Sequence, residues 1–298
     1  MTHQDIITPV DAAGELPAVR SITPADLKDA LARGLDDFWA MPTHVIFISL
    51  IYPVVGLALG RMAFGYDVVP MLFPLAAGFA LIGPFAAIGL YELSRRRALG
   101  LDTSWRHAFD VIQSPSFGSI VTLGLGLMAI FVIWLATANS IYIANFGYRE
   151  PTELTAFARQ VLTTPQGHSL IIVGNLVGFL FAAVAFSISV VAFPLLLDRN
   201  VGVMAAIVTS IRVVLKNPLS MALWGLIIAL ALVIGSLPFF IGLAVVMPVL
   251  GHASWHLYVK AVEPDTRPRP KLEPRPTTKR YAADFPAALF PWGGDKQP

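Results

Sequence analysis

Long apolar segments alternate with short polar connections along most of this chain. A helix that spans a membrane needs about 20 mostly apolar residues, because the hydrocarbon core of a bilayer is about 30 Å thick. Four segments have this length and carry no charged residue in their interiors: 44–62, 71–93, 117–138 and 168–197. The pattern predicts an all-α fold, a polytopic transmembrane helical bundle.

A fifth apolar segment, 219–260, is twice as long as one span requires. Its midpoint holds Gly235-Ser236-Leu237-Pro238, which is typical of a turn. We therefore expect two further spans, 219–235 and 238–259, and about six in total. Because the first of these two is short, a re-entrant hairpin over 219–259 is the alternative.

Basic residues give the expected orientation of these spans. Lys and Arg collect on the cytoplasmic side of bacterial membrane proteins. With six spans and the N-terminus inside, 18 of the 21 basic residues lie in inner segments and only Arg61, Arg149 and Arg159 lie outside. The sequence thus predicts a multi-pass protein of the bacterial inner membrane, with both the N- and the C-terminus in the cytoplasm.

The polar ends of the chain flank a membrane domain predicted over 23–262. Residues 1–22 are expected to form a disordered tail without a signal peptide, and 263–298 a disordered basic tail with eight prolines. Between them, 24–40 predicts an interfacial amphipathic helix, for which Thr23 and Asp26 have capping-box spacing. This helix either packs on the inner end of the bundle or docks a partner.

Two inner connections resemble each other. Each begins with Arg-x-x-Gly, at Gly100 and at Gly202, continues through an amphipathic stretch, and ends at a proline, Pro115 and Pro218. The separations from glycine to proline are 15 and 16 residues. We interpret this as a weak internal repeat, of the kind from which many transporters are built, although inert bundles also arise by duplication.

Composition narrows the function classes. The chain is 56% hydrophobic and 13% charged, against about 25% charged residues in soluble domains. A net charge of +2 gives no indication of nucleic-acid binding, and the lack of cysteine excludes disulfides and thiol chemistry. No phosphate-binding loop, dinucleotide fingerprint, HExxH or GxSxG motif occurs. We expect no catalytic residue, no cofactor and no enzymatic activity.

One histidine pair has the spacing of a metal or haem site. His252 and His256 are four residues apart, so they share a face of the predicted last span. Neutral imidazole is a common ligand of metals and of haem iron. The alternative is that the two histidines pack at the inner membrane interface, where Trp255 and Tyr258 would form an aromatic belt. We favour this interfacial packing and predict no metal site.

Three other polar residues are candidates for function. Glu92 and Asp198 lie at the inner ends of predicted spans, beside Arg95 and Arg199. Each is either a functional carboxylate or part of a solvated ion pair with the neighbouring arginine. Asn175 is polar within a span, where it either lines a pathway or makes a hydrogen bond to another helix. The small-residue motifs at 56–60 and 174–178 would allow helices to approach closely.

Five blocks of sequence carry a resemblance to a known family. The chain is similar over about residues 30–262 to a bacterial family of uncharacterised membrane proteins, domain of unknown function 2189, most clearly at 34–44, 52–56, 73–84, 89–96 and 248–258. The resemblance implies a predicted integral membrane protein, and it implies no substrate or chemistry.

Three functions are consistent with these observations. We favour a structural or accessory membrane protein that associates with lipids or with another membrane protein, and not with nucleic acid. A small-molecule transporter built on the repeat is the alternative, and a haem- or metal-binding respiratory accessory protein is the third. An ion-coupled transporter usually has carboxylates in mid-membrane, and the predicted spans have none. The sequence leaves the oligomeric state open.

Overall fold

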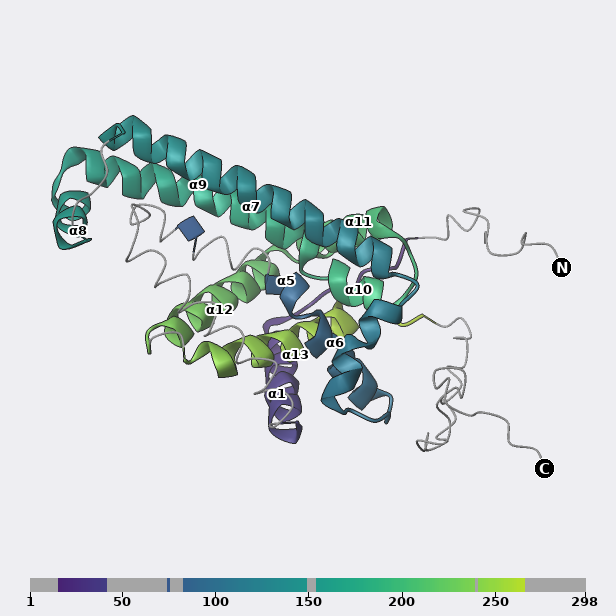
Figure 1. The fold of residues 1–298 in the computed structure, drawn as a ribbon. Helices are drawn as coiled ribbons and strands as arrows, with labels where there is room; N and C mark the ends of the chain where they lie inside the picture. Colours follow the sequence, from purple (N-terminus) through teal and green to yellow (C-terminus); the bar gives the residue numbers. More distant parts are fainter. Residues whose placement is uncertain (1–15, 42–73, 76–82, 149–153, 239–240, 266–298) are drawn as a thin grey trace, which may run out of the picture. The chain divides into compact units, whose positions relative to one another are not determined.

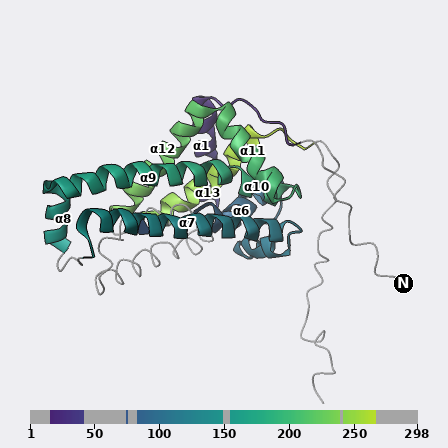
Figure 2. The same cartoon turned by 90° about the horizontal axis from the view of Figure 1, so that it is seen from above.

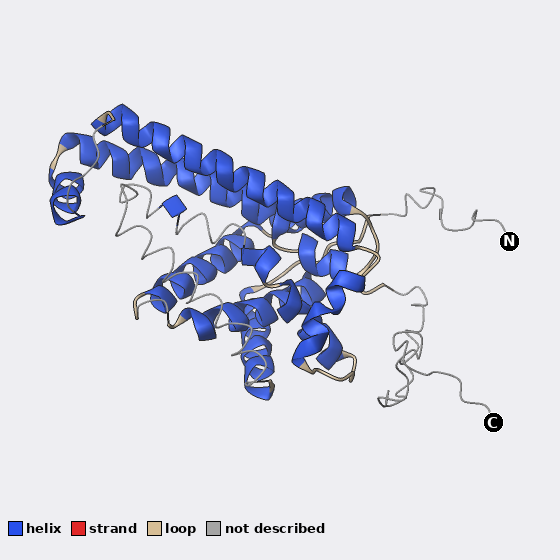
Figure 3. Cartoon of the chain, in the orientation of Figure 1, coloured by secondary structure: helices blue, strands red, loops and turns tan. Residues whose placement is uncertain are grey.

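The computed structural model describes residues 16–41, 74–75, 83–148, 154–238 and 241–265. In these ranges the protein is helical, and its one β feature is a single antiparallel bridge (Figures 1 and 3). The chain divides into a unit of Met1–Glu263 and a tail of Pro264–Pro298. The predicted span 44–62, with its motif at 56–60, lies outside the described residues, as does nearly all of the predicted C-terminal tail.

Three helical segments are long and apolar enough to cross a membrane. They are α7 (Phe117–Phe146), the continuous stretch Pro165–Asp198, and α12 (Pro218–Ser236). α7 runs eight residues beyond the predicted end at 138. It packs beside α9 (Pro165–Ser189), and α8 (Leu154–Thr163) lies between them in the chain (Figures 1 and 2). The described residues therefore support a membrane-spanning helical fold without reaching the predicted six spans.

The predicted span 168–197 is not one straight helix. α9 ends at Ser189, and a two-residue turn leads into α10 (Ala192–Asp198). Pro194 accounts for the break, because it donates no hydrogen bond and its ring clashes with the carbonyl four residues earlier, that of Val190. α10 is a buried segment rather than the end of a lipid-facing span, since its residues 192–196 are all buried.

The segment predicted as span two also breaks. In its described part, α5 (Gly83–Ala86) is followed by a turn at Ala87 and then by α6 (Ile88–Ala98). α6 continues five residues past the predicted end at 93. It is enclosed by α13, α10 and the 3₁₀-helix η2 (Trp105–Gln113), so most of its first two turns are buried.

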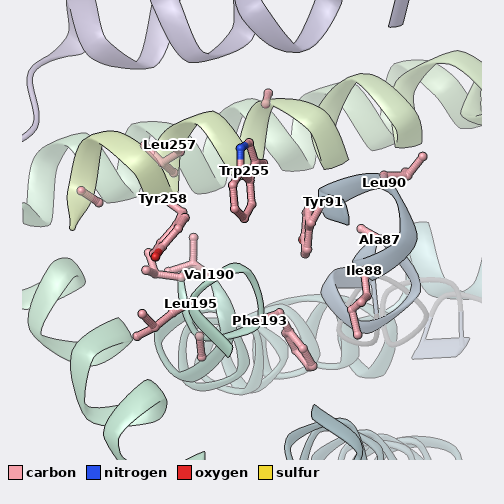
Figure 4. Packing of buried hydrophobic residues seen from close by; sticks show 14 of the residues in the cluster. Ala87, Ile88, Leu90, Tyr91, Val190, Phe193, Leu195, Trp255, Leu257 and Tyr258 are labelled. Atoms are coloured by element: carbon pink, nitrogen blue, oxygen red, sulfur yellow. The ribbon is translucent and has the colours of Figure 1, made fainter. Parts of the chain in front are cut away.

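The last helix, α13 (Leu243–Ala261), begins five residues later than predicted and is not among the three candidate spans. Most of its second half is buried, because α1, α6, α10 and α12 all pack against it. Trp255 and Tyr258 point into this core beside residues of α6 and α10 (Figure 4). The prediction that they form an interfacial aromatic belt is wrong.

The predicted helix 24–40 is present as α1 (Pro24–Ala40). Thr23 and Asp26 form the expected capping box, in which each side chain bonds the backbone of the other. α1 makes its main contact with α13. The crossing is close: a Cβ at Gly34 would lie 2.6 Å from the backbone nitrogen of Ala253. Gly34 therefore sets how near α1 can approach.

The N-terminal tail is ordered further back than predicted. Residues 16–22 are described, and Val19 pairs with Val262 in the antiparallel bridge. Ile22 is buried, its N–H donates to Asn217 Oδ1 at 2.7 Å, and its carbonyl accepts from Ser220 at 2.7 Å. Backbone groups find partners on two helices here, which is why this polar-looking segment does not stay disordered.

The two connections predicted as a repeat share one backbone feature. Gly100 and Gly202 have φ of 68° and 78°, the left-handed region that glycine enters without strain. The elements that follow differ, since the first is the 3₁₀-helix η2 and the second is the α-helix α11 (Val203–Lys216). Both then lead into a candidate span, α7 and α12.

Candidate functional site

A buried carboxylate joins three helices that are far apart in the sequence. Asp37 of α1 is only 3% exposed. Its Oδ2 accepts hydrogen bonds from Ser94 Oγ of α6 at 2.5 Å and from His256 Nε2 of α13 at 2.9 Å. Its Oδ1 pairs with the guanidinium of Arg97. The close crossing at Gly34, one turn earlier, brings Asp37 within reach of α13.

His252 completes this cluster. It is fully buried, and its Nδ1 lies 2.7 Å from Ser94 Oγ. The same nitrogen is 4.0 Å from Asp37 Oδ2, too far for a hydrogen bond. His252 and His256 therefore reach one carboxylate by different routes, the first through Ser94 and the second directly. We call Asp37, Ser94, Arg97, His252 and His256 the Asp37 cluster.

The electrostatics of the cluster favour an ionised Asp37. Burial raises the pKa of its carboxyl, but hydrogen bonds from His256, Ser94 and Arg97 outweigh that effect and lower the pKa to about 2. Hydrogen bonds to Asp37 and Asp36 raise the pKa of Arg97, whose guanidinium lies 3.0 Å from Asp36 Oδ2. The negative charge is thus paired and hydrogen-bonded, as burial requires.

Serine, histidine and aspartate in contact suggest a hydrolytic triad, but the geometry differs from one. In such a triad the histidine lies between the serine and the carboxylate. Here Ser94 lies between Asp37 and His252, and its hydroxyl donates to the carboxylate. Ser94 and His252 are 1% and 0% exposed, so their reactive atoms are closed to a substrate. The arrangement links helices rather than activating a nucleophile.

The two histidines predicted as low-probability ligands do lie in one cluster, yet they face hydrogen-bond partners. Within the described residues, no group of three or more His, Cys, Asp or Glu side chains is placed to hold a metal ion. His252 Nε2 is buried without a hydrogen-bond partner. His252 is enclosed by protein, whereas the His256 side chain is 14% exposed.

Glu92 and Asp198 do not form the solvated ion pairs that we predicted from the sequence as the alternative to a functional role. The Glu92 side chain is 4% exposed and forms a two-bond pair with Arg95, at 2.7 and 2.8 Å. Asp198 is equally enclosed and accepts a hydrogen bond from the Tyr258 hydroxyl at 2.7 Å. Both carboxylates therefore belong to the protein interior around α6, α10 and α13.

Asn175 also differs from prediction. It is exposed on α9, and its side-chain amide donates to the carbonyl of Ile171 in its own helix at 2.7 Å. Among the described residues, Asn175 does not make the expected hydrogen bond to another helix. Of the motif at 174–178, only Gly178 lies at a close approach, 3.0 Å from Trp134 for an added Cβ, while Gly174 faces open space.

The sequence did not reveal Asp37, Ser94 and Arg97 as site residues. Large apolar residues recur at helical spacing in 24–40, at Leu27, Leu31, Leu35 and Phe38. The buried stripe is instead formed by Leu27, Ala30, Gly34, Asp37 and Phe38. Leu35 is exposed. A carboxylate within a stripe of small and apolar residues is the indication that could have identified Asp37.

Comparison with known proteins gives one match. Residues 71–198 match the model of the family DUF2189, described as a predicted integral membrane protein. The match confirms the family resemblance within that segment, while the blocks at 34–44, 52–56 and 248–258 lie outside it. No curated protein and no solved structure matches the chain.

Proposed function

Taking as premise that this chain is a DUF2189 membrane protein, we propose that it is a non-enzymatic accessory protein that associates with lipids and with another membrane protein through its apolar helices. The observation that carries the proposal is the outer surface of α9. α9 is part of the apolar stretch Pro165–Asp198, of which 33% of the membrane-length window is buried. Between Ile171 and Val184 the exposed polar residue is Asn175, and seven large apolar residues are exposed around it. They are Ile171, Ile172, Val173, Leu176, Phe179, Leu180 and Val184.

This surface is too apolar to face water. Monomeric soluble proteins rarely expose contiguous apolar patches larger than about 300–600 Å². Several polar side chains of α7 and α9 bond their own helix, as Thr122, Thr137 and Ser187 each do with the carbonyl four residues earlier. Such helices suit contact with lipid tails or with the helix of a partner.

The proposed topology has both ends in the cytoplasm of a bacterial cell, with the protein in the inner membrane. The bridge between Val19 and Val262 supports it. Two segments joined by backbone hydrogen bonds lie on one side of a membrane, so the chain between them crosses an even number of times. α1, the Arg95–Arg97 end of α6 and the end of α13 also meet in one polar cluster, and all three are predicted inner segments.

The buried Asp37 cluster supports a structural role over an enzymatic one. The Ser94 hydroxyl and the His252 imidazole are closed to solvent, and the Asp37 carboxylate is paired with Arg97 and hydrogen-bonded to His256. The proposal therefore assigns the Asp37 cluster to holding α1, α6 and α13 together, and assigns association to the apolar faces.

A photo-crosslinking experiment in native membranes tests this proposal. A photoreactive amino acid replaces Phe179, which is 68% exposed on α9, and the control replaces Trp134, which is buried between α7 and α9. We expect adducts with lipid and with a recurrent membrane protein from position 179, and an intramolecular adduct from position 134. Equal absence of outside adducts from both positions contradicts the proposal.

A small-molecule transporter is the second candidate, and the paired left-handed glycines favour it. Gly100 and Gly202 occupy equivalent places in two connections that each lead into a candidate span, as a duplicated transporter fold requires. Vesicles with the purified protein would be assayed for uptake of labelled amino acids, sugars and nucleosides. Uptake above that of empty vesicles, without any partner, overturns the accessory function in favour of transport.

A further inference from the structure

The 3₁₀-helix η2 carries three large apolar side chains that are 38–60% exposed. Its inner residues Ala108 and Val111 are buried, while Trp105, Phe109 and Ile112 are exposed. The Trp105 and Phe109 rings lie 6.2 Å apart, edge to face. Residues three apart eclipse in a 3₁₀-helix, which places Ile112 beside Phe109. Three large apolar side chains thus stand together at the surface.

A polar clamp fixes η2 in this orientation. Arg96 of α6 donates to the Asp102 carbonyl at 2.6 Å and pairs with Asp110 at 3.4 Å. The ring of His107 bridges the two carboxylates, with Nδ1 2.6 Å from Asp110 and Nε2 3.0 Å from Asp102. Asp110 is therefore held by Arg96 and His107, and Asp102 by His107, while the large apolar side chains of η2 remain exposed.

Continuity with a candidate span indicates what covers the exposed face. Three residues, 114–116, separate η2 from Phe117, the first residue of α7. η2 is thus placed where α7 enters the membrane. The Arg106 guanidinium lies over the Trp105 ring, 5.9 Å from its centroid. An indole beside a cation, with apolar neighbours, is the composition that settles in the headgroup layer, the ring at the boundary and the cation among phosphates.

We propose that η2 is an interfacial anchor whose Trp105, Phe109 and Ile112 insert into the phospholipid headgroup layer, with Arg106 against lipid phosphate. This rests on the proposed function only in requiring that α7 and α9 face lipid. The anchor fixes the depth of the α7 entrance, and through Arg96 it ties that depth to α6 and to the core around α13.

Spin-label accessibility in phosphatidylcholine vesicles tests the anchor. The natural chain has no cysteine, so single labels at Ile112→Cys, Phe179→Cys and Lys28→Cys need no other change. Ile112 is chosen because both aromatic rings of η2 stay in place. Collision with oxygen reports the apolar phase, and collision with a water-soluble nickel chelate reports water. We expect the 112 label at a shallow membrane depth, between the deep 179 label and the water-exposed 28 label.

The outcomes separate the anchor from the proposed function. A 112 label as accessible to nickel as the 28 label, with the 179 label in the apolar phase, overturns the anchor alone. A 112 label shielded from both reagents means that a second protein copy covers η2, which also overturns it. If the 179 label is accessible to nickel, the proposed function fails as well.

The role of Arg106 is tested in the same labelled protein. Adding phosphatidylglycerol to the vesicles should move the 112 label deeper, because each basic residue near an anionic surface strengthens association about fivefold. Arg106→Gln should abolish this dependence on lipid charge and leave the 179 label unmoved. Equal dependence with and without Arg106 rejects the contact with lipid phosphate.

Discussion

Two groups of helices in this protein satisfy their polar and apolar groups in opposite ways. α7 and α9 pack against each other, but the membrane-length windows of α7 and of the stretch Pro165–Asp198 that contains α9 are only 22% and 33% buried. The side chains of Thr122, Thr137 and Asn175 bond carbonyls of their own helix. α1, α6 and α13 instead enclose a carboxylate, a serine and two imidazoles, and these groups bond across helices.

This difference indicates which groups determine the specific pairing of helices in a membrane protein. Lipid tails are as apolar as leucine, so apolar faces such as those of α7 and α9 gain little by choosing one neighbour. Buried polar groups lose water and must find a partner, and the geometry of that partner is narrow. We infer that the Asp37 cluster fixes the arrangement of α1, α6 and α13, whereas the outer faces of α7 and α9 remain free to associate.

The largest expected effect comes from removing the central carboxylate. Asp37→Ala leaves Arg97, His256 and Ser94 without their shared acceptor, and breaking a buried ion pair costs about 3 kcal/mol. Asp36→Ala is the matched control, because Asp36 also pairs with Arg97 but its side chain is 72% exposed, and exposed pairs contribute about 0–1 kcal/mol. Thermal unfolding in one detergent measures both variants. Equal midpoints would show that the cluster does not hold the three helices.

The second prediction concerns the crossing of α1 and α13. Gly34→Ala places a methyl group 2.6 Å from the Ala253 backbone nitrogen, so the two helices must separate. Overpacking of this kind costs about 1–3 kcal/mol. Gly174→Ala in α9 is the control, because an added Cβ there meets nothing within 4 Å. The control should keep or raise the unfolding midpoint, and a similar loss in both variants would contradict the close-crossing argument.

Hydrophobicity along the sequence was sufficient to locate α7, α9 and α12, because their apolar runs have the length that a bilayer requires. It could not distinguish a helix covered by lipid from one covered by protein. α10 has an apolar composition similar to a span and α13 lies in a segment predicted as one, yet the structure buries α10 and most of the second half of α13 inside the protein. Pro194 and Pro248 mark both segments, but a proline shows where a helix bends or breaks and not what surrounds it.

The Asp37 cluster was predictable only in part. The spacing of His252 and His256 indicated that the two rings share a face, and they do meet one carboxylate system. Their partner lies 219 residues away in the chain, and no local pattern identifies a contact of that separation. Arg97 was assigned to the inner side by charge alone, which gave its side of the membrane without its neighbour.

The third prediction uses pH to probe the same contrast. The pKa of Asp37 is about 2 in the folded protein, below its ordinary value of 3.8. A carboxyl whose folded pKa is lowered adds stability that is complete above about pH 4 and is lost as the pH falls towards 2. The unfolding midpoint should therefore drop across this window, and Asp37→Asn should show a smaller drop. Asp26, whose pKa is also about 2, remains in that variant, so Asp26→Asn serves as the comparison. An identical pH profile in Asp37→Asn would mean that Asp37 is not the group titrating there.

The smallest expected effect lies on α9. Among the described residues, the Asn175 side chain bonds only the Ile171 carbonyl of its own helix. Asn175→Ala removes this side chain, and the carbonyl keeps its place in the helix ladder. Since the side chain is exposed, no neighbouring helix loses a partner, and we expect the free energy of unfolding to change by no more than about 0.5 kcal/mol.

Ser94→Ala is the matched variant in the core. It removes a hydroxyl that bonds both Asp37 and His252, and it should lower the free energy of unfolding by about 1–3 kcal/mol. Both variants are measured by thermal unfolding in the same detergent and again in lipid nanodiscs. A loss at Asn175 as large as that at Ser94 would mean that α9 has a specific polar neighbour, and the contrast between lipid-facing and protein-facing helices would then fail at this position.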